Sequence, residues 1–376
     1  MNIGYSELFQ LSDYLKVFDP VVFQTPFKTR LILKDLSVII VNYRCWDKLA
    51  QCLDSLTAIS QTSVSFEVIV VDNASEDGRL LKFRQLYKHI SFLSNQGNWG
   101  FSSGNNLGAT AARGKYLLFL NPDTIVSEKV LTGMLDQAKV SNANSIISCR
   151  QIRHNGDEDK PFGVFPSPMA LTGWTRALAK LMHLNTNPIQ NERFIYPDWV
   201  SGSVILISKA SFNTIGAWDE RFWLYYEDVD LCQRARAAGG EVLLLMSVAL
   251  IHNHGGSSRS DSDITALTKA EVNISQHEYI SLHEKGIREV FMHAFLILNN
   301  IVFGFLPALL GLFFFFNKRL STVPKIYLKM LDYYFSAFFN NTWISPRSMQ
   351  HPEFFPLPNF KDTNLFPLGE DSPQRA

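Results

Sequence analysis

The sequence predicts an α/β fold with a mostly parallel, twisted central sheet and helices on both of its faces. Three short apolar runs, at residues 36–43, 66–75 and 115–124, each end in polar turn residues, as is typical of strands buried in a parallel sheet. Segments with helical spacing or turn chemistry separate these runs. This alternation predicts a doubly wound sheet with right-handed crossovers and a ligand crevice at the carboxyl ends of its strands.

The other elements follow in chain order. Leu49, Leu53 and Leu56 recur at helical spacing, which predicts a helix over 47–59 with Asp47 as its N-cap. We further expect a weaker strand at 90–95, a helix over 102–113 that stops at Gly114, a loop-rich insertion over 155–197, renewed order over 199–212 and a long strand over 241–253. The prolines of the insertion indicate that it shapes a substrate pocket or a lid.

Composition narrows the class of protein. The 376 residues include 35 basic and 35 acidic side chains and are 46% hydrophobic, which predicts a globular core and disfavours nucleic acid as a partner. The four cysteines form no CxxC pair, so we predict neither a zinc knuckle nor a disulfide framework, and we expect a reducing compartment. Residues 1–35 lack a basic stretch followed by an apolar run, so we expect no secretory signal there and assign them to an N-terminal extension.

The C-terminal third differs in character. Residues 294–316 contain no charged side chain, and their length suits the ~20 residues that a helix needs to cross a bilayer. Lys318 and Arg319 follow at once, which favours the cytosolic side for that end. The alternative is a buried or interfacial hairpin broken at Pro307. We assign 259–340 to a helical, membrane-contacting segment and 341–376 to a tail.

Polar residues stand at the ends of four predicted strands. Asn42 ends the first, Asp72 the second, Asn121 and Asp123 the third, and His252 the last. Because neighbouring strand ends converge in a doubly wound sheet, we expect these side chains to share one crevice. A carboxylate there suits a ribose or a base edge, and a carboxylate with an imidazole can hold a divalent cation beside a diphosphate. Each residue taken alone also has a structural explanation, such as an Asx-turn.

Three acids follow a cluster of aromatic residues in the segment FWLYYEDVD. Glu227, Asp228 and Asp230 stand where a helix running to Gly239 is predicted to begin. One explanation is that they complement the positive end of the helix. The other is that one of them is a general base, whose pKa the apolar surroundings raise.

Five ordered blocks resemble glycosyltransferase family 2, which has the GT-A fold, and most of all its bacterial rhamnosyltransferase-like branch. The matching text is SVIIVNYRCWDKLAQCLDSL, FEVIVVDNASEDG, NQGNWGFSSGNNLGATAARGKYLLFLNPDT, DWVSGSVILISKASFNTIGAWDERFWLYYEDVDLCQRARAAGGEV and LIHNHGGSS. The resemblance covers residues 36–258, which we therefore expect to form the GT-A domain.

The resemblance implies a role for each site residue. The implied donor-binding residues are Asn42 and Asp72 at the nucleoside, Phe101, Gly104 and Asn105 in the GFxxGNN segment, and Asn121 and Asp123 in the metal motif. Asp228 matches the catalytic base, supported by Glu227, and His252 matches a histidine that ligates the metal together with Asp123. We expect Trp218, Trp223 and Tyr226, with Phe222 and Tyr225, to wall the acceptor side.

The implied activity is inverting transfer of a sugar, with rhamnose as a candidate, from a nucleoside diphosphate to a saccharide or polyprenyl-linked glycan in surface polysaccharide synthesis. Mg²⁺ or Mn²⁺ is the implied cofactor, and membrane lipid at the cytoplasmic face is an expected partner. The metal motif reads Asn121-Pro122-Asp123, so an amide replaces its first acid and one negative charge is lost. Two rivals remain: a non-catalytic sugar- or nucleotide-binding module, and a nucleotidyltransferase, for which the glycines of a triphosphate loop are missing.

Overall fold

A computed structural model describes residues 34–168, 170–182, 188–253, 261–314 and 316–354. The expectations for the N-terminal extension and for the end of the tail lie outside these residues, apart from Lys34 and Asp35.

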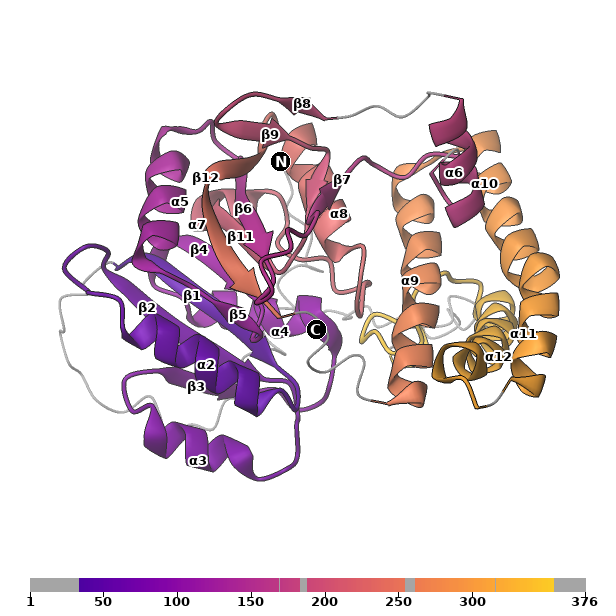
Figure 1. The fold of residues 1–376 in the computed structure, drawn as a ribbon, viewed down its shortest axis with the longest axis horizontal. Coiled ribbons are helices and arrows are strands. Elements are labelled where there is room, and N and C mark those ends of the chain that lie inside the picture. The colour runs from indigo at the N-terminus through magenta and orange to yellow at the C-terminus, as the bar shows by residue number, and fades with distance from the viewer. Residues whose placement is uncertain (1–33, 169, 183–187, 254–260, 315, 355–376) are drawn as a thin grey trace, which may run out of the picture. The chain divides into compact units, whose positions relative to one another are not determined.

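One mixed sheet forms the centre of the described chain (Figure 1). Its strands, in spatial order, are β3 (Ser91–Ser94), β2 (Phe66–Asp72), β1 (Lys34–Asn42), β4 (Gly114–Leu120), β11 (Val204–Ser208), β6 (Ile146–Ile152), β12 (Val242–His252), β9 (Phe194–Tyr196) and β8 (Ile189–Gln190). Strands β3, β2, β1 and β4 are parallel, and β6 and β12 are parallel to each other. Strand β11 runs antiparallel to both β4 and β6, so the two parallel groups point the same way and the sheet is mostly parallel, as predicted.

Helices cover both faces of this sheet (Figure 1). On one face lie α2 (Trp46–Thr57), α3 (Arg79–Leu86) and α5 (Glu128–Val140); on the other lie α4 (Gly100–Ala111), α7 (Lys209–Thr214) and α8 (Glu227–Ala237). In β1, Val38 and Ile40 pack into the first core, whereas Ile39 packs into the second. This alternation with period two buries both faces of the strand, which explains its continuous apolar sequence.

Two predicted helix ends are wrong. Cys45, not Asp47, is the N-cap of α2, and Asp47 lies in its first turn. Gly114 does not follow a helix as its cap but begins β4, where a Cβ would overlap the backbone of the neighbouring strand at Ser37. The expected loop-rich insertion holds a helix, α6 (Gly173–Leu181), whose capping box joins Thr172 and Thr175. It also holds the short strand β7 (Phe162–Gly163), which pairs with β10 (Trp199–Val200).

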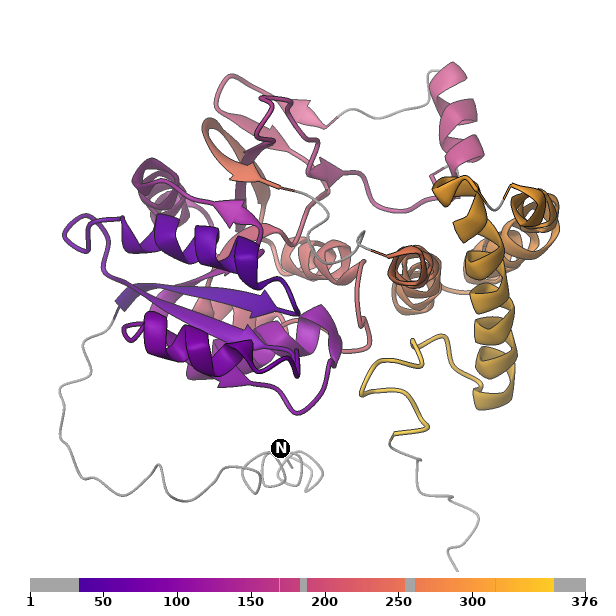
Figure 2. The same cartoon turned by 60° about the horizontal axis from the view of Figure 1, so that its bottom comes forward.

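A second group of helices follows the sheet: α9 (Ser262–His283), α10 (Ile287–Leu298), the π-helical turn η2 (Asn299–Phe303), α11 (Gly304–Phe313) and α12 (Lys318–Asn340) (Figures 1 and 2). Helix α9 joins them to the sheet, since His283 Nε2 lies 2.8 Å from an Asp230 carboxylate oxygen of α8. Residues 341–354, assigned to a tail from the sequence, also return to the sheet domain. The Ser348 hydroxyl donates to the Glu220 carbonyl at 2.6 Å.

Candidate active site

The first two predicted strand ends do meet. Asn42 and Asp72 are the last residues of β1 and β2, and they pair in register. The Asn42 amide donates to Asp72 Oδ1 at 3.2 Å, and the Ser75 hydroxyl donates to the same oxygen at 2.5 Å. Asp72 also lines a hollow of about 300 Å³ together with Ala74, Glu76, Asp77, Gly78, Leu80, Ser94, Asn95 and Gln96. Asp72 therefore forms part of the wall of a small polar recess at the carboxyl edge of the sheet, while the buried Asn42 contacts Asp72 without lining the recess.

A second polar group lies at the end of β12, where the chain that follows β4 forms the short strand β5 (Thr124–Ile125) and pairs with β12. Asp123 Oδ1 lies 3.2 Å from His252 Nε2, and the other ring nitrogen, Nδ1, lies 2.7 Å from the side-chain oxygen of Gln151. Lys48 of α2 donates to the Asn253 carbonyl at 2.5 Å, and its ammonium lies 4.0 Å from Asp123 Oδ2. Burial alone would raise the pKa of Asp123, but the hydrogen bond and charge of His252 and the charge of Lys48 together lower it.

Asp228 stands at the start of α8 on a strained backbone. Tyr225 and Tyr226, just before the helix, both adopt left-handed conformations, with φ of 70° and 66°. Such angles cost a non-glycine residue roughly 1–2 kcal/mol, and strain of this kind gathers at functional sites. The Asp228 carboxylate accepts from the Gly202 N–H at 2.9 Å and from the Val229 N–H at 2.9 Å. Burial raises its pKa, although these backbone donors oppose the rise.

The two acids beside it differ from Asp228. Glu227 is buried, its Oε2 has no hydrogen-bond partner, and burial followed by the charge of Asp228 raises its pKa well above the ordinary value. Asp230 faces away from this pair and accepts from Arg234 and from His283. Burial would raise the pKa of Asp230, but those two partners lower it. Asp230 therefore holds α9 against α8 rather than serving as a free base.

The segment 201–203 links the two halves of the site. The Gly202 N–H binds Asp228, while the Ser203 carbonyl accepts from the Asn121 N–H at 2.9 Å. The Ser203 hydroxyl also bonds the Gln151 side chain that contacts His252. One short backbone segment therefore fixes the distance between Asp228 and the Asp123–His252 pair.

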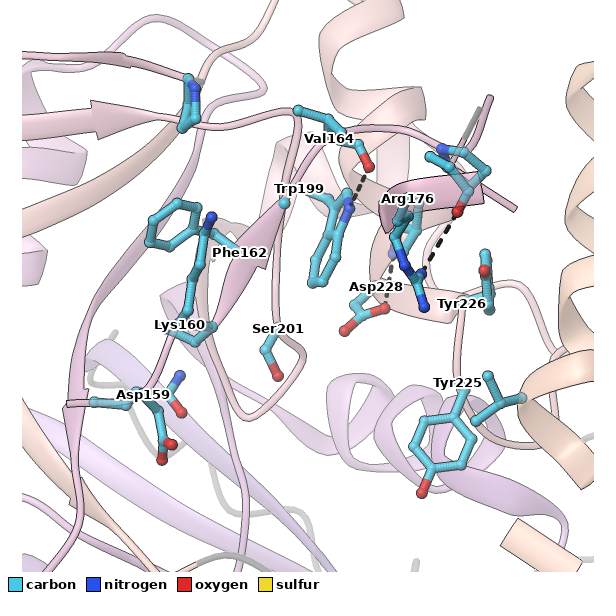
Figure 3. A pocket seen from close by; sticks show the side chains of 18 of the residues that line it. Asp159, Lys160, Phe162, Val164, Arg176, Trp199, Ser201, Tyr225, Tyr226 and Asp228 are labelled. Atoms are coloured by element: carbon cyan, nitrogen blue, oxygen red, sulfur yellow. Dashed lines mark hydrogen bonds between the residues drawn. The ribbon is translucent and has the colours of Figure 1, made fainter. Parts of the chain in front are cut away.

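A single cavity of about 1440 Å³ adjoins both halves. Asp228 and Tyr225 line one part of it, and Lys48, Gln151 and Asn253, which contact Asp123 or His252, line another. Figure 3 shows the Asp228 carboxylate with Ser201, Tyr225, Tyr226 and Arg176 around this space. Its size exceeds the range of roughly 300–1,000 Å³ typical of one ligand, and is sufficient for two substrates.

The expected aromatic wall is only partly present. Tyr225 and Tyr226 line the cavity. Trp218 does not reach it but packs in the sheet core against Phe119, and Phe222 packs against Val229. Trp223 is buried and donates to the Asn98 carbonyl at 2.8 Å. The spacing of the aromatics in the sequence did not distinguish cavity residues from core residues.

The GFxxGNN segment forms the first turns of α4 and packs mainly inside the protein. Gly104 lies so close to Val41 of β1 that a Cβ would overlap its side chain. Asn105 is buried and donates to the Phe101 carbonyl at 3.0 Å. Phe101 is half-buried, and a Cβ placed on Gly202 would lie 3.3 Å from its ring. Of the three, only Phe101 approaches the segment that holds Asp228.

Comparison with known proteins decides the family. The profile described as Glycosyl transferase family 2 matches residues 37–190. The low-salt glycan biosynthesis hexosyltransferase Agl10 of Haloferax volcanii is 30% identical over 232 residues, which cover 59% of this chain and 68% of Agl10. This chain belongs to glycosyl transferase family 2.

Two further similarities accompany this assignment. The N-acetylglucosaminyl-diphospho-decaprenol L-rhamnosyltransferase of Mycobacterium tuberculosis is 27% identical over 252 residues, covering 60% of this glycosyltransferase and 78% of the relative. A crystal structure of GalNAc-T7 with UDP, GalNAc and Mn²⁺ aligns with a TM-score of 0.46 and 14% identity, covering 66% of this chain and 50% of that one. Its membership of glycosyl transferase family 2, together with its mostly parallel sheet, makes this chain a glycosyltransferase with GT-A architecture.

Three cavity residues of this family 2 enzyme were not found from the sequence. Lys48 was assigned only to a helix, Gln151 ends a strand that was not predicted, and Arg176 lies in the insertion. Gln151 has the signal that identified the other strand-end residues, because it is a polar side chain near the carboxyl end of an apolar run, IISCRQI. Nothing comparable in the sequence marks Arg176, since a single arginine on a short helix is common on protein surfaces.

GT-A glycosyltransferases generally use a divalent cation, and the Asp123–His252 pair fits one. Two neighbouring ligands of an octahedral ion with bonds of 2.0–2.1 Å are separated by about 3 Å, close to the 3.2 Å between Asp123 and His252. If His252 Nδ1 donates to Gln151, a neutral imidazole directs the lone pair of Nε2 toward the Asp123 carboxylate. A cation bound between these two groups would remove their mutual repulsion. Among residues 34–354 as described, no three His, Cys, Asp or Glu side chains cluster as a complete site, so donor phosphates and waters would supply the other ligands.

Proposed function

We propose that this glycosyltransferase moves a sugar from a nucleoside diphosphate to an acceptor hydroxyl with inversion at the anomeric carbon. One observation carries the proposal: a single cavity is bordered by the half-buried carboxylate of Asp228 and by the residues that contact Asp123 and His252. A base and a diphosphate site on different walls of one cavity is the arrangement that single displacement requires.

The donor lies along the carboxyl edge of the sheet in this proposal. The nucleoside occupies the recess at Asn42 and Asp72, and the diphosphate lies near Asp123 and His252. Mg²⁺ or Mn²⁺ held by Asp123 and His252 would neutralise the charge of the leaving diphosphate. Lys48 contributes a further positive charge at that end of the cavity, which reduces the dependence on the acid that Asn121 replaces.

Asp228 is the proposed general base. The acceptor oxygen forms a bond to the anomeric carbon while the bond from that carbon to the diphosphate oxygen breaks. The acceptor proton passes to Asp228, and the electron pair of the broken bond leaves with the nucleoside diphosphate. The raised pKa of Asp228 makes it a stronger base than an ordinary aspartate, and general-base assistance is typically worth ~10²–10⁴-fold. Glu227 supports the base as a buried neighbour outside the cavity lining, and Tyr225 and Tyr226 border the acceptor.

The substrates are proposed from the relatives and from the chain's own surface. The mycobacterial relative is named for transfer of L-rhamnose to an N-acetylglucosaminyl-diphospho-decaprenol. We therefore favour an activated rhamnose as donor and a saccharide or lipid-linked glycan as acceptor, in surface polysaccharide synthesis. The apolar helix at 287–313 favours work at the cytoplasmic face of the membrane, where such an acceptor is reachable.

The decisive experiment is a donor screen with the purified protein. dTDP-rhamnose and a panel of UDP- and GDP-sugars are offered with a lipid-linked acceptor, and the released nucleoside diphosphate is measured. We expect release from one donor class, dependent on the acceptor, with the opposite anomeric configuration in the product. Binding of nucleotide-sugars without any release would instead establish a non-catalytic module.

A further inference from the structure

A large apolar surface lies on the helices that follow the sheet. Residues 290–317 contain no charged side chain. Among the described residues, one helix, 287–313, is long and apolar enough to cross a membrane. The 18-residue window that meets this criterion has a mean hydropathy of 2.0, and 17% of the window is buried. Soluble monomers seldom expose apolar patches of more than a few hundred Å², so this surface needs a partner.

Helix α12 extends the same surface. Its buried residues Met330, Tyr333 and Ala337 face α9, whereas a second apolar stripe is exposed. That stripe consists of Leu328, Leu331, Phe335, Phe338 and Phe339. The spacing of three or four residues places these side chains along one side of the helix.

Helices α11 and α12 are packed tightly enough to act as one unit. A Cβ on Gly311 would lie 2.5 Å from the Leu320 carbonyl, and one on Gly304 would lie 3.4 Å from the Tyr327 ring. The backbones therefore approach closely, and Figures 1 and 2 show the two helices side by side. The exposed apolar residues of α11 and the stripe of α12 belong to a single body.

The two asparagines of η2 are hydrogen-bonded to neighbouring helices. Asn299 accepts from the Trp174 indole of α6 at 3.0 Å, and Asn300 donates to the Tyr334 hydroxyl at 2.9 Å. These amides, which made a membrane span doubtful from the sequence, are satisfied by neighbouring helices. The outward surface of this region is mainly apolar, and α12 also exposes one acid there, Asp332.

The path of the chain excludes a simple span. Helix α9 leads into this region and contacts α8 of the sheet domain through His283 and Asp230. Residues 341–354 return to the sheet domain, where Ser348 binds Glu220 and the Arg347 guanidinium lies 5.8 Å from the Trp223 ring. Both ends of 287–340 are therefore on the side of the catalytic domain. Helix α12 cannot serve as a return span, because Lys325 pairs with Asp263 of α9 at 2.7 Å. A polar helix at that depth would be costly in a bilayer.

We infer that α6, α10, η2, α11 and α12 form a monotopic docking surface that lies in the plane of one leaflet of an anionic bilayer. The inference deepens the membrane location given under Proposed function, but it is independent of the donor and of the chemistry at Asp228. An amphipathic element of this kind inserts its apolar face about 5–10 Å into the headgroup and acyl boundary.

Charge supports lipid as the occupant. Residues 284–340 contain six basic side chains (Lys285, Arg288, Lys318, Arg319, Lys325 and Lys329) and three acidic ones (Glu284, Glu289 and Asp332). Arg288 is paired with Glu284 at 2.8 Å and Lys325 with Asp263 at 2.7 Å, and a positive excess remains after both pairs are counted. Basic residues that flank an apolar surface are attracted to anionic headgroups, by about 1 kcal/mol each near the surface. A second copy of the chain would carry the same positive excess and would repel this face.

Single-cysteine labelling tests the topology. All four native cysteines are buried, so new surface cysteines can be read against a low background. Lys285→Cys lies before the apolar helix, Leu320→Cys lies after it, and Lys82→Cys on α3 reports the catalytic domain. A membrane-impermeant maleimide is applied to right-side-out and inside-out vesicles from expressing cells. We expect all three sites to react from the same side. Reaction of Leu320→Cys from the opposite side would establish a span and overturn the inference.

Vesicle flotation tests the surface itself. The variant Phe335→Ser/Phe338→Ser/Phe339→Ser changes residues that are 67%, 81% and 65% exposed, and Leu81→Ser/Leu86→Ser, at 65% and 64%, is the matched control on α3. We expect the α12 variant to partition at least roughly tenfold less onto phosphatidylcholine–phosphatidylglycerol vesicles, and the control to bind like the wild type.

Two further readouts separate the outcomes. Sugar transfer to a water-soluble acceptor should be unchanged in the α12 variant, so a failure of the proposed chemistry would not be confused with a failure of docking. Wild-type protein that does not float with anionic vesicles, but forms a dimer by light scattering that the α12 variant abolishes, would assign this face to a second copy and overturn the inference.

Discussion

Neighbouring acids can have different roles because the backbone turns each one into different surroundings. Glu227 points into the protein with an unpartnered oxygen, Asp228 borders the cavity with two backbone donors, and Asp230 pairs with Arg234 and His283. The two left-handed tyrosines before α8 produce this turn. Capping and catalysis were competing explanations from the sequence. Asp228 is not the N-cap of α8, which is Tyr226, but it accepts the Val229 N–H in the first turn, and this contact is compatible with its proposed role as base.

Asp228→Asn should keep the fold and donor binding but lose turnover by ~10²–10⁴-fold, since an amide cannot accept the acceptor proton. In the wild type, kcat should also fall as the pH drops through the raised pKa of Asp228, because only the carboxylate is a base. Asp47→Asn is a matched control, as it changes the second residue of α2 just as Asp228 is the second residue of α8. Near-normal turnover of Asp228→Asn would remove Asp228 from the role of base.

Glu227→Gln should change how stability depends on pH. The native pKa of Glu227 is raised, so the folded state binds more protons than the unfolded state, and the free energy of unfolding falls as pH rises above about 4.5. Each pH unit in that window costs up to about 1.4 kcal/mol. Glutamine cannot ionise, so the variant should match the wild type near pH 4 and become the more stable protein at pH 8.

Urea denaturation across this pH range measures the Glu227 effect. Glu128→Gln is the matched control, because Glu128 is likewise the first residue of a helix but is exposed. Parallel stability profiles for wild type and Glu227→Gln would show that this carboxyl is already ionised in the folded protein.

At the scale of elements, a glycine joins α4 to the segment before α8. Gly100 has a φ of 92°, and a Cβ there would overlap the Trp223 carbonyl, which also accepts from the Phe101 N–H at 2.9 Å. This contact positions the strained tyrosines that lead into Asp228. The start of α4 therefore acts on the site through the backbone of its neighbour.

Gly100→Ala should destabilise the fold by roughly 3 kcal/mol or more and lower turnover, because strain at positive φ is added to a steric overlap. Gly78→Ala isolates the first effect, since Gly78 has a φ of 75° but no atom within 4 Å of a Cβ. That control should cost only about 1–2 kcal/mol. Chemical denaturation of the two variants gives both values, and equal losses would contradict the steric role of Trp223.

Much of the sheet was predictable because its strands are buried on both faces. The consecutive apolar residues Val38, Ile39 and Ile40 predict a strand that is buried on both faces. The positions of Asn42 and Asp72 at strand ends follow from the bounds of such strands. The ends of helices were less predictable, since Gly114 serves a close strand contact that only the register reveals. Periodicity cannot report such contacts between distant segments.

The meeting of polar side chains was predictable where they stand at strand ends, as at Asp123 and His252. It was missed where a long side chain reaches in from elsewhere, as Lys48 does from α2. Trp218 shows the opposite error, because an aromatic beside the site in sequence is a core residue in space. The direction in which a side chain points is set by tertiary packing, and a single sequence does not reveal that direction.

At the scale of the whole molecule, the proposed cation site depends on residues at or after the ends of β4, β6 and β12 and on the substrate together. EDTA should abolish sugar transfer, and Mn²⁺ or Mg²⁺ should restore it, because two protein ligands hold an ion weakly without the donor diphosphate. Binding of Mn²⁺ measured with UDP or dTDP present should weaken when Asp123 is changed to alanine. Full activity in EDTA would reject a cation role and leave Lys48 as the source of positive charge.

The strap at residues 201–203 has a consequence for how such an enzyme changes specificity. The Gly202 N–H binds Asp228, the proposed base, and the Ser203 carbonyl binds the Asn121 N–H, next to the proposed diphosphate site. The distance between these two parts of the site therefore depends on the backbone of residues 201–203 rather than on the side chains of that segment. Substitution of residues that line the cavity can alter which sugar is bound, but not the distance between the proposed base and the proposed diphosphate site. Accommodating a bulkier reacting unit would require an insertion or deletion in that three-residue tether.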